Sequence, residues 1–437
     1  MPEYKVCIVG VGFVGLTLAL SLTKRGQHVI AIEKDLSVVN ELRDGYVRFD
    51  EPDLISHMSE AKSKGLFEVF SPGENMEILK ECNVFILTVG TPLSLGVVNL
   101  EFLENAIRII RPYVSLNDLV IIRSTVKIGI TETLVKRILD ETTSGYFLAM
   151  CPERTVEGFA LKEMGSLPQI IGGIDSISSE VAANFFKVFD SEIVQVQDTQ
   201  TAEMVKLVNN TYRDLMFGFA NEIAGICNEF GINPREVIQA ANHNYSRSNI
   251  AFPGLTGGPC LEKDPWILAD SAESKNFTAS ITMASRHVNE AVITSYFEKT
   301  LGDITGSIKK IAILGLSFKG RPSIRDARGG FALPLLAILD RKGTLYTSTG
   351  YEPAGKVLIE HNNLRIAESL AEAVSDADIV VILTNALEFH TSGGQINESA
   401  NSAAIIVDYW GVLDREKLGP NQVYFSFPGE KPNLRIS

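Results

Sequence analysis

One cysteine lies in a stretch whose residue types could do covalent chemistry. In GGPCLEKDPW, residues 257–266, two glycines and a proline precede Cys260, and Lys263 follows three positions later. The spacing offers neither a CxxC partner nor a nearby histidine, so it indicates neither a metal site nor a redox dithiol. A lone cysteine is usually a small buried apolar residue, but a nearby lysine favours the thiolate, and a glycine turn lets backbone approach a ligand closely. Both interpretations of Cys260 stay open on this stretch alone.

A lysine and an asparagine, Lys206 and Asn210, lie four residues apart in a segment with helical periodicity. Residues at this spacing project from the same face of a helix. A solvated polar stripe would explain them. However, Lys206 stands between Val205 and Leu207, and a partly buried ammonium beside an amide can stabilise an oxyanion. The pair therefore has a structural and a catalytic interpretation.

Two carboxylates, Glu153 and Glu157, follow a predicted strand in MCPERTVEG, residues 150–158. Carboxylates are common on solvated surfaces, so we expect both to be exposed by default. Their place at the carboxyl end of a strand nevertheless favours one of them as a general base.

A glycine-rich turn, GVGFVG, follows the first predicted strand and opens a helix. Its candidate cofactor-binding residues are Gly10, Gly12, Phe13, Val14 and Gly15. The motif alone would also fit a tight strand-to-helix turn, but Glu33 ends the second strand, where a carboxylate accepts hydrogen bonds from an adenosine ribose. This context predicts dinucleotide binding. The carboxylate favours NAD over NADP, although Lys34 beside it weakens that preference.

Three further residues, Thr91, Pro92 and Thr125, lie at the carboxyl ends of other predicted strands. Ligands of open α/β sheets bind at such strand ends. Helix capping or turn formation would explain these residues equally well.

The combination of a dinucleotide fold, the Lys206 and Asn210 pair and a lone Cys260 favours oxidation through a covalent thiol adduct. A hydride acceptor turns an alcohol into an aldehyde. A nucleophilic cysteine can then hold the aldehyde as a thiohemiacetal, which gives up a second hydride and leaves a thioester for water.

Composition restricts the partners and the compartment. The 437 residues indicate two or three domains, and a net charge of −13 argues against nucleic acid as a partner. The apolar run near the start holds the glycines of the turn, so we expect neither a signal anchor nor a membrane partner. The scattered cysteines favour a cytoplasmic protein without a disulfide framework, and they are Cys7, Cys82, Cys151, Cys227 and Cys260.

The elements that must position these residues change in kind along the chain. Apolar runs alternate with helical patterns at both ends, which predicts two Rossmann-like, doubly wound parallel sheets. The strands predicted in the first sheet span residues 4–10, 28–33, 67–70, 83–90, 118–125 and 146–151. Those predicted in the second span residues 310–316, 344–353, 377–385, 403–410 and 422–427.

Between the two sheets we expect a helical domain. Apolar residues recur at steps of three or four from residue 199 to Gly231, which predicts one long helix with an apolar face. The residues of that face are Met204, Val208, Tyr212, Leu215, Phe219, Ile223 and Ile226. We therefore divide this α/β chain into an NAD-binding domain (1–198), a central helical domain (199–304) and a C-terminal substrate domain (305–437).

Taken together, these motifs resemble the UDP-glucose/GDP-mannose dehydrogenase family, which oxidises the C6 alcohol of a nucleotide sugar to a carboxylate with two NAD. The resemblance covers nearly the whole chain, with the motifs in the family's order and spacing. They are GVGFVG, STVKIG, CPERTVEG, AEMVKLVNNTYRDLMFGFANE, GGPCLEKD and ILGLSFKG. The resemblance implies a homodimer built on the central helices.

The resemblance also implies a role for each matching residue. Cys260 is similar to the family's nucleophile, Lys206 and Asn210 to its polarising pair, and Asp264 and Glu157 to its water-activating groups. Further positions resemble active-site or substrate contacts, namely Thr125, Glu153, Arg154, Arg247, Gly257 and Lys263. Lys319 and Arg325 lie in the region that the family uses for the nucleotide half.

Some positions depart from the family's pattern. Gly90 stands where a proline is common, the stretch SIRDARG lacks a proline that often occurs there, and Glu352 replaces a usual aspartate. CPERTVEG with LPQIIGG, and KDPW after the cysteine, look more like the branch that acts on UDP-N-acetylhexosamines. We therefore expect UDP-N-acetylmannosamine or UDP-N-acetylglucosamine, with UDP-glucose or GDP-mannose as the alternatives.

Two rival functions remain for comparison. A one-step β-hydroxyacid dehydrogenase would also use a dinucleotide domain, a helical domain and the Lys206 and Asn210 pair, but it has no use for Cys260 or for a second α/β domain. A catalytically inactive NAD-binding regulator would be marked by loss of Cys260 or Lys206, and both are present.

Overall fold

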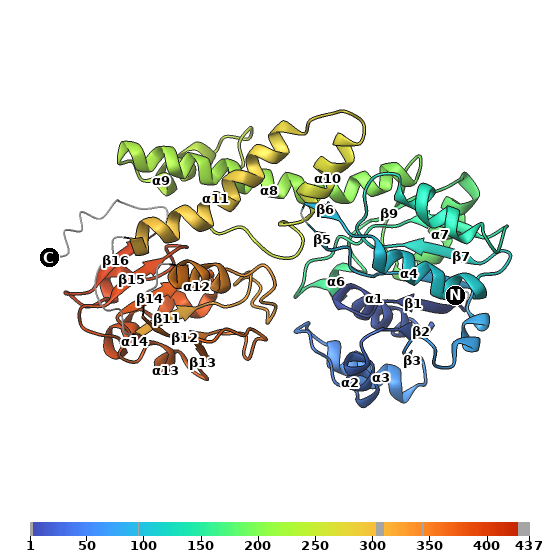
Figure 1. Cartoon of the computed structure of the whole chain (residues 1–437), viewed down its shortest axis with the longest axis horizontal. Helices are drawn as coiled ribbons and strands as arrows, with labels where there is room; N and C mark the ends of the chain where they lie inside the picture. Colours follow the sequence, from blue (N-terminus) through green and yellow to red (C-terminus); the bar gives the residue numbers. More distant parts are fainter. Residues whose placement is uncertain (1–2, 95, 303–309, 342–344, 427–437) are drawn as a thin grey trace. The chain divides into compact units, whose positions relative to one another are not determined.

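The computed structural model describes residues 3–94, 96–302, 310–341 and 345–426. The chain forms two compact units. The first comprises Met1–Asn209 with Trp266–Thr278, and the second comprises Asn210–Pro265 with Ala279–Ser437. Each unit is built on one large sheet (Figure 1).

The described part of the first unit contains an eight-stranded sheet in the order β10-β9-β8-β7-β4-β1-β2-β3. Its strands are β1 (Lys5–Val9), β2 (His28–Ile32), β3 (Phe67–Phe70), β4 (Val84–Leu87), β7 (Leu119–Ile122), β8 (Phe147–Met150), β9 (Gln169–Gly173) and β10 (Ile193–Gln195). The run from β3 through β1 and β4 to β8 is parallel and has the strand order of a dinucleotide-binding fold. Its order reverses between β1 and β4, where such folds bind their ligands.

Alternate strand residues divide the core between the two faces of this sheet. Ile8 belongs to a cluster with α1 (Phe13–Thr23) and α7 (Ser176–Phe186), whereas its neighbour Val9 belongs to a cluster with α4 (Glu101–Ile110). Because helices cover both faces, the central strands β4, β7 and β8 are apolar along their whole length. The other helices before the central region are α2 (Leu36–Asp44), α3 (Leu54–Ser63), α5 (Arg137–Leu139) and α6 (Ala160–Glu163).

One edge of this sheet departs from the purely parallel arrangement predicted from the sequence. β9 runs antiparallel to β8, and β10 runs parallel to β9. Neither β9 nor β10 was predicted, because QIIGG ends in two glycines and the IVQ of β10 is only three residues long. A Cβ on Gly172 would lie 2.1 Å from the carbonyl oxygen of Asp198, so glycine lets this edge pack closely. A short hairpin of β5 (Leu93–Ser94) and β6 (Val97–Val98) was also missed.

The long helix predicted from residue 199 is α8 (Thr199–Phe230), and it ends at Gly231, whose φ of 68° is left-handed. Its predicted apolar face is largely exposed, with 60% exposure at Tyr212 and 49% at Phe219. The helix instead buries polar residues, among them Asp214 and Asn221. The helices that follow are α9 (Pro234–Asn242), α10 (Asp264–Glu273) and α11 (Ser280–Gly302) (Figure 1).

The described part of the second unit contains a six-stranded parallel sheet in the order β13-β12-β11-β14-β15-β16. Its strands are β11 (Lys310–Leu314), β12 (Thr347–Tyr351), β13 (Leu364–Ile366), β14 (Ile379–Ile382), β15 (Ile405–Asp408) and β16 (Val423–Ser426). This order repeats that of β3 to β8, which confirms two Rossmann-like sheets. β13 was not predicted, and the ends of two predicted strands, at residues 344 and 427, lie outside the described residues.

Helices cover both faces of the second sheet as well. α12 (Ala332–Arg341) packs on one face, and α13 (Leu370–Val374) and α14 (Gly393–Ser399) pack on the other. Among the helices of the described residues, none combines the length and the apolar character needed to cross a membrane.

Candidate active site

The glycine-rich turn after β1 has the geometry of a phosphate-binding turn. Gly10 has a φ of 88°, and a Cβ there would lie 2.9 Å from Cγ1 of Val89. A Cβ on Gly15 would lie 2.0 Å from the carbonyl oxygen of Gly10, so this glycine allows α1 to pack against the turn. A Cβ on Gly12 would meet nothing within 4 Å, and no side chain caps the start of α1 at this residue. The N-terminus of α1 can therefore accept a pyrophosphate, as the dinucleotide motif requires.

Glu33 follows β2 and holds the glycine-rich turn. Its Oε2 accepts a hydrogen bond from the amide of Val11 at 3.0 Å, and its Oε1 accepts one from the amide of Asp35 at 3.0 Å. Each carboxylate oxygen has a second lone pair, so the half-buried Glu33 can still accept from a ribose diol. The ammonium of Lys34 lies 3.5 Å from the centroid of the Phe102 ring. This cation–π contact occupies the Lys34 ammonium, which the sequence suggested would weaken the preference for NAD over NADP.

Two candidate cofactor contacts, Thr91 and Thr125, connect the loops that follow β4 and β7. The hydroxyl of Thr91 donates to the carbonyl oxygen of Thr125 at 2.6 Å, and Thr91 is only 2% exposed. Thr125 is half-buried at the same strand end. The hydrogen bond from its hydroxyl thus gives Thr91 the structural role that the sequence also allowed.

Phe13 and Val14, two further candidate cofactor contacts, are half-buried in the first turn of α1.

Glu153 is held by a buried arginine that the sequence did not single out. Nε and Nη2 of Arg123 donate to its Oε2 at 2.9 and 2.6 Å, and the two side chains are 2% and 7% exposed. Nη1 of Arg123 also donates to the carbonyl oxygen of Cys151 at 3.2 Å. The other carboxylate oxygen of Glu153 accepts from the amides of Arg154 and Thr155, both at 2.7 Å. These contacts shape the loop that follows β8.

The expectation that Glu153 is exposed is therefore wrong, because this loop folds around its carboxylate. Burial raises the pKa of Glu153, but the charge of Arg123, the amide of Thr155 and the charge of Lys206 outweigh burial, so the pKa is lowered. A carboxylate with these donors is a poor proton acceptor. Glu157 on the same loop is half-buried, and Nη2 of Arg154 donates to the carbonyl oxygen of Pro168 at 2.5 Å.

Lys206 is buried rather than part of a solvated stripe. It is 8% exposed on α8, and its charge acts on Glu153. Leu207 beside it is fully buried in a small apolar cluster with Val98 and Ile267. An ammonium in such surroundings is poised to stabilise negative charge that develops nearby.

Asn210 and Asp264 meet in the second unit. Nδ2 of Asn210 donates to Oδ2 of Asp264 at 2.6 Å, and the residues are 6% and 1% exposed. Oδ1 of Asp264 is buried without a hydrogen-bond partner among the described residues. The amide of Asp264 donates to the carbonyl oxygen of Cys260 at 2.9 Å, so the buried carboxylate and the cysteine belong to one turn at the start of α10.

Cys260 is exposed, whereas the other four cysteines of the chain are buried. The usual interpretation of a lone cysteine as a buried apolar residue is therefore wrong here. Lys263 is half-buried on the same turn, and its amide also donates to the carbonyl oxygen of Cys260, at 3.1 Å. An accessible thiol in a well-defined turn can act as a nucleophile.

The glycines before Cys260 permit a close approach to the chain itself. A Cβ on Gly257 would lie 2.3 Å from the carbonyl oxygen of Gly329, and one on Gly258 would lie 2.5 Å from Cδ2 of Phe318. Gly258 also has a φ of 95°, and its amide donates to the carbonyl oxygen of Gly329 at 3.1 Å. The expected close approach to a ligand is thus, in the first place, an approach to residues 318–329.

The segment after β11 carries two candidate substrate contacts. Nζ of Lys319 lies 5.6 Å from the ring centroid of Phe318, and Arg325 lies beside Gly355. Arg247 is exposed, with its guanidinium 4.7 Å from the ring centroid of Tyr245. Because the Phe318 ring also packs against Gly258, Lys319 lies next to the turn that carries Cys260.

Glu352 occupies the place in the second sheet that Glu33 has in the first, after the second strand. Its Oε2 accepts from the amides of Leu316 and Ser317 at 2.8 and 2.9 Å, as Glu33 accepts from Val11. Glu352 is only 3% exposed, and its Oε2 accepts from the Ser317 hydroxyl as well. Burial raises the pKa of Glu352 despite these donors. This carboxylate fixes its turn and is too enclosed to contact a ribose.

Three family models match the chain along its length. The NAD binding, central and UDP binding domains of the UDP-glucose/GDP-mannose dehydrogenase family match residues 4–190, 200–291 and 312–415. The chain belongs to this family. It is therefore an NAD-dependent nucleotide-sugar dehydrogenase, and the glycine turn with Glu33 fits its cofactor.

Relatives of this dehydrogenase match over nearly their whole length. A protein named UDP-N-acetyl-D-mannosamine dehydrogenase from Methanocaldococcus jannaschii is 33% identical over 420 residues, which cover 94% of this chain and 93% of that protein. The NDP-N-acetyl-D-galactosaminuronic acid dehydrogenase of Ralstonia nicotianae is 31% identical over 431 residues, 94% of this chain and 97% of that protein. The solved UDP-D-ManNAc dehydrogenase of Pyrococcus horikoshii superposes with a TM-score of 0.84 at 29% identity, covering 97% of this chain and 99% of that one.

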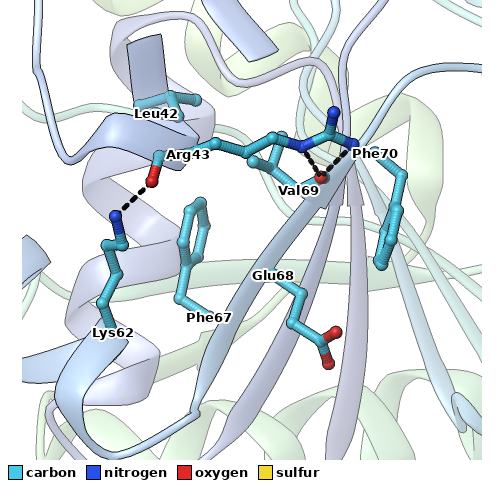
Figure 2. A pocket seen from close by; sticks show the side chains of 7 residues that line it. All are labelled: Leu42, Arg43, Lys62, Phe67, Glu68, Val69 and Phe70. Atoms are coloured by element: carbon cyan, nitrogen blue, oxygen red, sulfur yellow. Dashed lines mark hydrogen bonds between the residues drawn. The ribbon is translucent and has the colours of Figure 1, made fainter. Parts of the chain in front are cut away.

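A separate pocket of the dehydrogenase, of about 250 Å³, lies beside the edge strand β3 (Figure 2). Nε and Nη2 of Arg43 donate to the carbonyl oxygen of Val69 at 3.2 and 3.1 Å, and Lys62 donates to the carbonyl oxygen of Arg43. The basic groups of this pocket thus bind the chain's own backbone. The residues that line it include none of the candidate site residues, and they are Leu42, Arg43, Lys62, Phe67, Glu68, Val69 and Phe70.

Proposed function

We propose that this dehydrogenase oxidises the C6 alcohol of a UDP-N-acetylhexosamine to the carboxylate, through a covalent adduct on Cys260. The observation that carries the proposal is the exposure of Cys260, alone among the five cysteines, in a turn anchored on residues that belong to the UDP binding domain. The names of the Methanocaldococcus and Pyrococcus relatives support UDP-N-acetylmannosamine as the sugar, ahead of UDP-N-acetylglucosamine. UDP-glucose and GDP-mannose are the alternatives.

The chemistry balances with water and two hydride acceptors. Two molecules of NAD, held in turn by the glycine turn and Glu33, would supply the hydride acceptors. The C6 alcohol loses one hydride, with its hydroxyl proton going to solvent, to give the aldehyde, and the adduct on Cys260 loses the second hydride. The thiolate of Cys260 adds to the C6 aldehyde, and the oxyanion so formed gains a proton to complete the thiohemiacetal. Loss of that proton and of a hydride leaves a thioester. Water then adds to the thioester carbon, the C–S bond breaks, and the carboxylate leaves while the thiolate is restored.

The chain's own residues divide the work of these steps. Lys206 and Asn210 stabilise the oxygen at C6 whenever it bears negative charge. Asp264 is the proposed acceptor of a proton from the attacking water, because its Oδ1 is buried and has no hydrogen-bond partner among the described residues. Glu157 is the second proposed water-activating group and Thr125 a further contact. Glu153, which is saturated by donors, acts as a fixed anion that orients the loop and the charge of Lys206.

Other residues are proposed to bind the non-reacting parts of the cofactor and of the nucleotide sugar. Gly10, Gly12 and Gly15 would hold the pyrophosphate of NAD and Glu33 its adenosine ribose, with Phe13, Val14, Thr91 and Thr125 as the further proposed cofactor contacts. The nucleotide sugar is assigned to Arg154, Arg247, Gly257, Lys263, Lys319 and Arg325, while Glu153 contributes to this site by shaping the loop after β8.

We further propose that the protein is a homodimer through the exposed apolar face of α8. Tyr212, Phe219 and Ile226 on this face are 60%, 49% and 48% exposed, and Phe230 is 76% exposed. A second copy would bury such a stripe, whereas monomers rarely leave one open. A division into domains at residues 198 and 304 and a reducing, cytoplasmic location, which free cysteines favour, complete the proposal.

The test is NADH yield on a panel of UDP- and GDP-sugars. We expect two NADH per sugar consumed, the uronic acid as product, and the highest kcat/KM with UDP-N-acetylmannosamine. One NADH per sugar, with the C6 aldehyde as product, would overturn the proposed second oxidation on Cys260 and leave a one-step dehydrogenase. A higher kcat/KM with UDP-glucose or GDP-mannose would overturn the proposed sugar while leaving the reaction intact.

A further inference from the structure

A chain of buried polar side chains joins α8 to α11 in the second unit. Nδ2 of Asn221 donates to Oδ1 of Asn289 at 2.9 Å, and Nδ2 of Asn289 donates to both the carbonyl oxygen and Oδ1 of Asp214, each at 2.9 Å. Nη1 of Arg286 donates to the same Oδ1 of Asp214 at 2.6 Å. All four residues are at most 3% exposed, and Arg286 is fully buried.

Both ends of this chain of side chains hold the loop that carries Cys260. Oδ1 of Asn221 accepts from the amide of Gly254 at 2.9 Å, and its Nδ2 donates to the carbonyl oxygen of Gly254 at 3.1 Å. At the other end, Nη1 of Arg286 donates to the carbonyl oxygen of Leu261 at 2.9 Å. Cys260 lies between the two anchor points and immediately before the second.

The cost of this arrangement indicates that it does more than join two helices. Arg286 is fully buried, and its Nη2 has no hydrogen-bond partner among the described residues, while its Nε lies 3.4 Å from Oε1 of Glu290. Apolar side chains could join two helices without desolvating a charge pair. They could not hold a backbone carbonyl in one place, which is what Nη1 of Arg286 does.

We propose that Arg286 is a positioning residue for Cys260 and acts through the carbonyl of Leu261, with Asn221 as the second anchor of the same loop. The inference rests on the proposed role of Cys260 as the nucleophile. Arg286 is too deeply buried to touch substrate or cofactor, so its effect is on the place of the thiol. When the Leu261 carbonyl is released, the turn in which Lys263 and Asp264 donate to the Cys260 carbonyl loses its support on that side.

The experiment compares Arg286→Met with two control variants. Glu290→Gln removes the acid beside Nε and leaves both bonds of Nη1, and Leu370→Ala truncates a buried residue in a different core cluster of the same unit. For each variant we would measure kcat, KM for NAD and for the nucleotide sugar, thermal stability, and hydrogen exchange of the peptide that covers residues 255–264.

We expect Arg286→Met to lower kcat about 100-fold, the scale of a displaced reacting group, with little change in either KM. Exchange in residues 255–264 should become faster. Glu290→Gln should change neither kcat nor exchange in residues 255–264. Leu370→Ala should lower thermal stability without changing kcat or that exchange. A folded Arg286→Met protein with unchanged kcat, or one with lower kcat and unchanged exchange in this peptide, would overturn the proposal.

Two further variants keep the proposal testable if Arg286→Met does not fold. Asp214→Asn with Arg286→Met removes both buried charges. Asn221→Leu releases the loop at Gly254, along with the Asn221–Asn289 bond, and leaves the Leu261 anchor in place. Each should lower kcat and speed exchange in residues 255–264, and normal values of both in either folded protein would contradict the inference. Exchange is measured without turnover, so this result stays separate from failure of the proposed function, which Cys260→Ala tests.

Discussion

Asn210 and Asp264, 54 residues apart in the sequence, are joined by a buried hydrogen bond of 2.6 Å from Nδ2 to Oδ2. The bond commits one amide hydrogen of Asn210 and one carboxylate oxygen of Asp264. Oδ1 of Asp264 is left buried with no hydrogen-bond partner within the described residues. A buried acceptor in this state costs free energy, and an incoming water that donates to it would recover that cost.

Replacing Asp264 by asparagine should block release of the acid. Asparagine keeps the shape of the side chain but cannot take a proton from water, so the thioester on Cys260 should accumulate. We expect a burst of about two NADH per active site, one for each hydride transfer, followed by slow turnover. Rapid-mixing absorbance at the NADH band would measure it. The matched variant Glu273→Gln, at the exposed end of the same helix, should behave like the unmodified enzyme, and a normal steady state for Asp264→Asn would remove its proposed role.

Replacing Glu33 by alanine should narrow the preference for NAD over NADP. The carboxylate follows the second strand, where dinucleotide-binding folds place an acid that accepts from the ribose diol and repels a 2′-phosphate, and the amide of Val11 donates to it. The change should raise KM for NAD and lower that for NADP, measured at saturating nucleotide sugar. Equal kcat/KM with the two cofactors in the unmodified enzyme would contradict this assignment.

The sequence was most informative where function and local structure share the same few residues. The glycines of the first turn and Glu33 lie within one βαβ unit, so spacing alone placed Glu33 directly after the second strand, while its hydrogen bond with the amide of Val11 in the turn was not predicted. The pair Lys206 and Asn210 was recognised because a helix has a fixed period. The two parallel sheets followed from apolar strands that are covered on both faces.

The sequence was least informative where a partner comes from far along the chain. Arg123 reaches Glu153 from 30 residues away, and Arg286 reaches Asp214 from 72. No local pattern marks such an arginine, so Glu153 was expected to be exposed and the support of Cys260 was not foreseen. Periodicity predicted a long helix with an apolar face, and α8 is that helix, but periodicity alone cannot tell whether such a face is buried or exposed.

Removing the charge of Lys206 should slow both hydride steps and hydrolysis. Lys206→Ala is expected to lower turnover on the order of 100-fold, the effect of losing one preorganised donor. NAD binding, followed by protein fluorescence, should change little because the glycine turn and Glu33 are untouched. Near-normal turnover would assign Lys206 a structural role only.

The ionisation of Glu153 should make part of the stability depend on pH. Its pKa in the folded protein is lowered, because the charges of Arg123 and Lys206 and the amide of Thr155 outweigh burial. A group with a depressed folded pKa stabilises the fold above its unfolded pKa of about 4.3, and this contribution is lost as the pH falls through the folded value.

Glu153→Gln should therefore unfold at a lower temperature than the unmodified protein at pH 7, with the gap narrowing as the pH is lowered toward 3. Thermal denaturation followed by circular dichroism across this range measures the gap. Glu180→Gln, an exposed position on α7, is the control and should show no such trend. A gap that stays constant with pH would show that the pKa of Glu153 is the same in the folded and the unfolded protein. Arg123→Met, which removes the buried ion-pair partner of Glu153, should lower the free energy of unfolding by about 3–5 kcal/mol.

Cys260 is where the covalent mechanism meets its most direct test. If the thiol only fills space, Cys260→Ala should still make acid. If it is the nucleophile, the variant should fold and bind NAD and the nucleotide sugar, because other residues hold both ligands. It should nevertheless fail to form acid, since the aldehyde then has no thiohemiacetal from which a second hydride can leave. In the unmodified enzyme, iodoacetamide should modify Cys260 ahead of the four buried cysteines, and bound nucleotide sugar should slow that reaction. Mass spectrometry of the labelled peptides and of the sugar product measures both effects. Substantial acid formation by a folded Cys260→Ala protein would refute the covalent route, while the assignment of the NAD site by the glycine turn and Glu33 would stand.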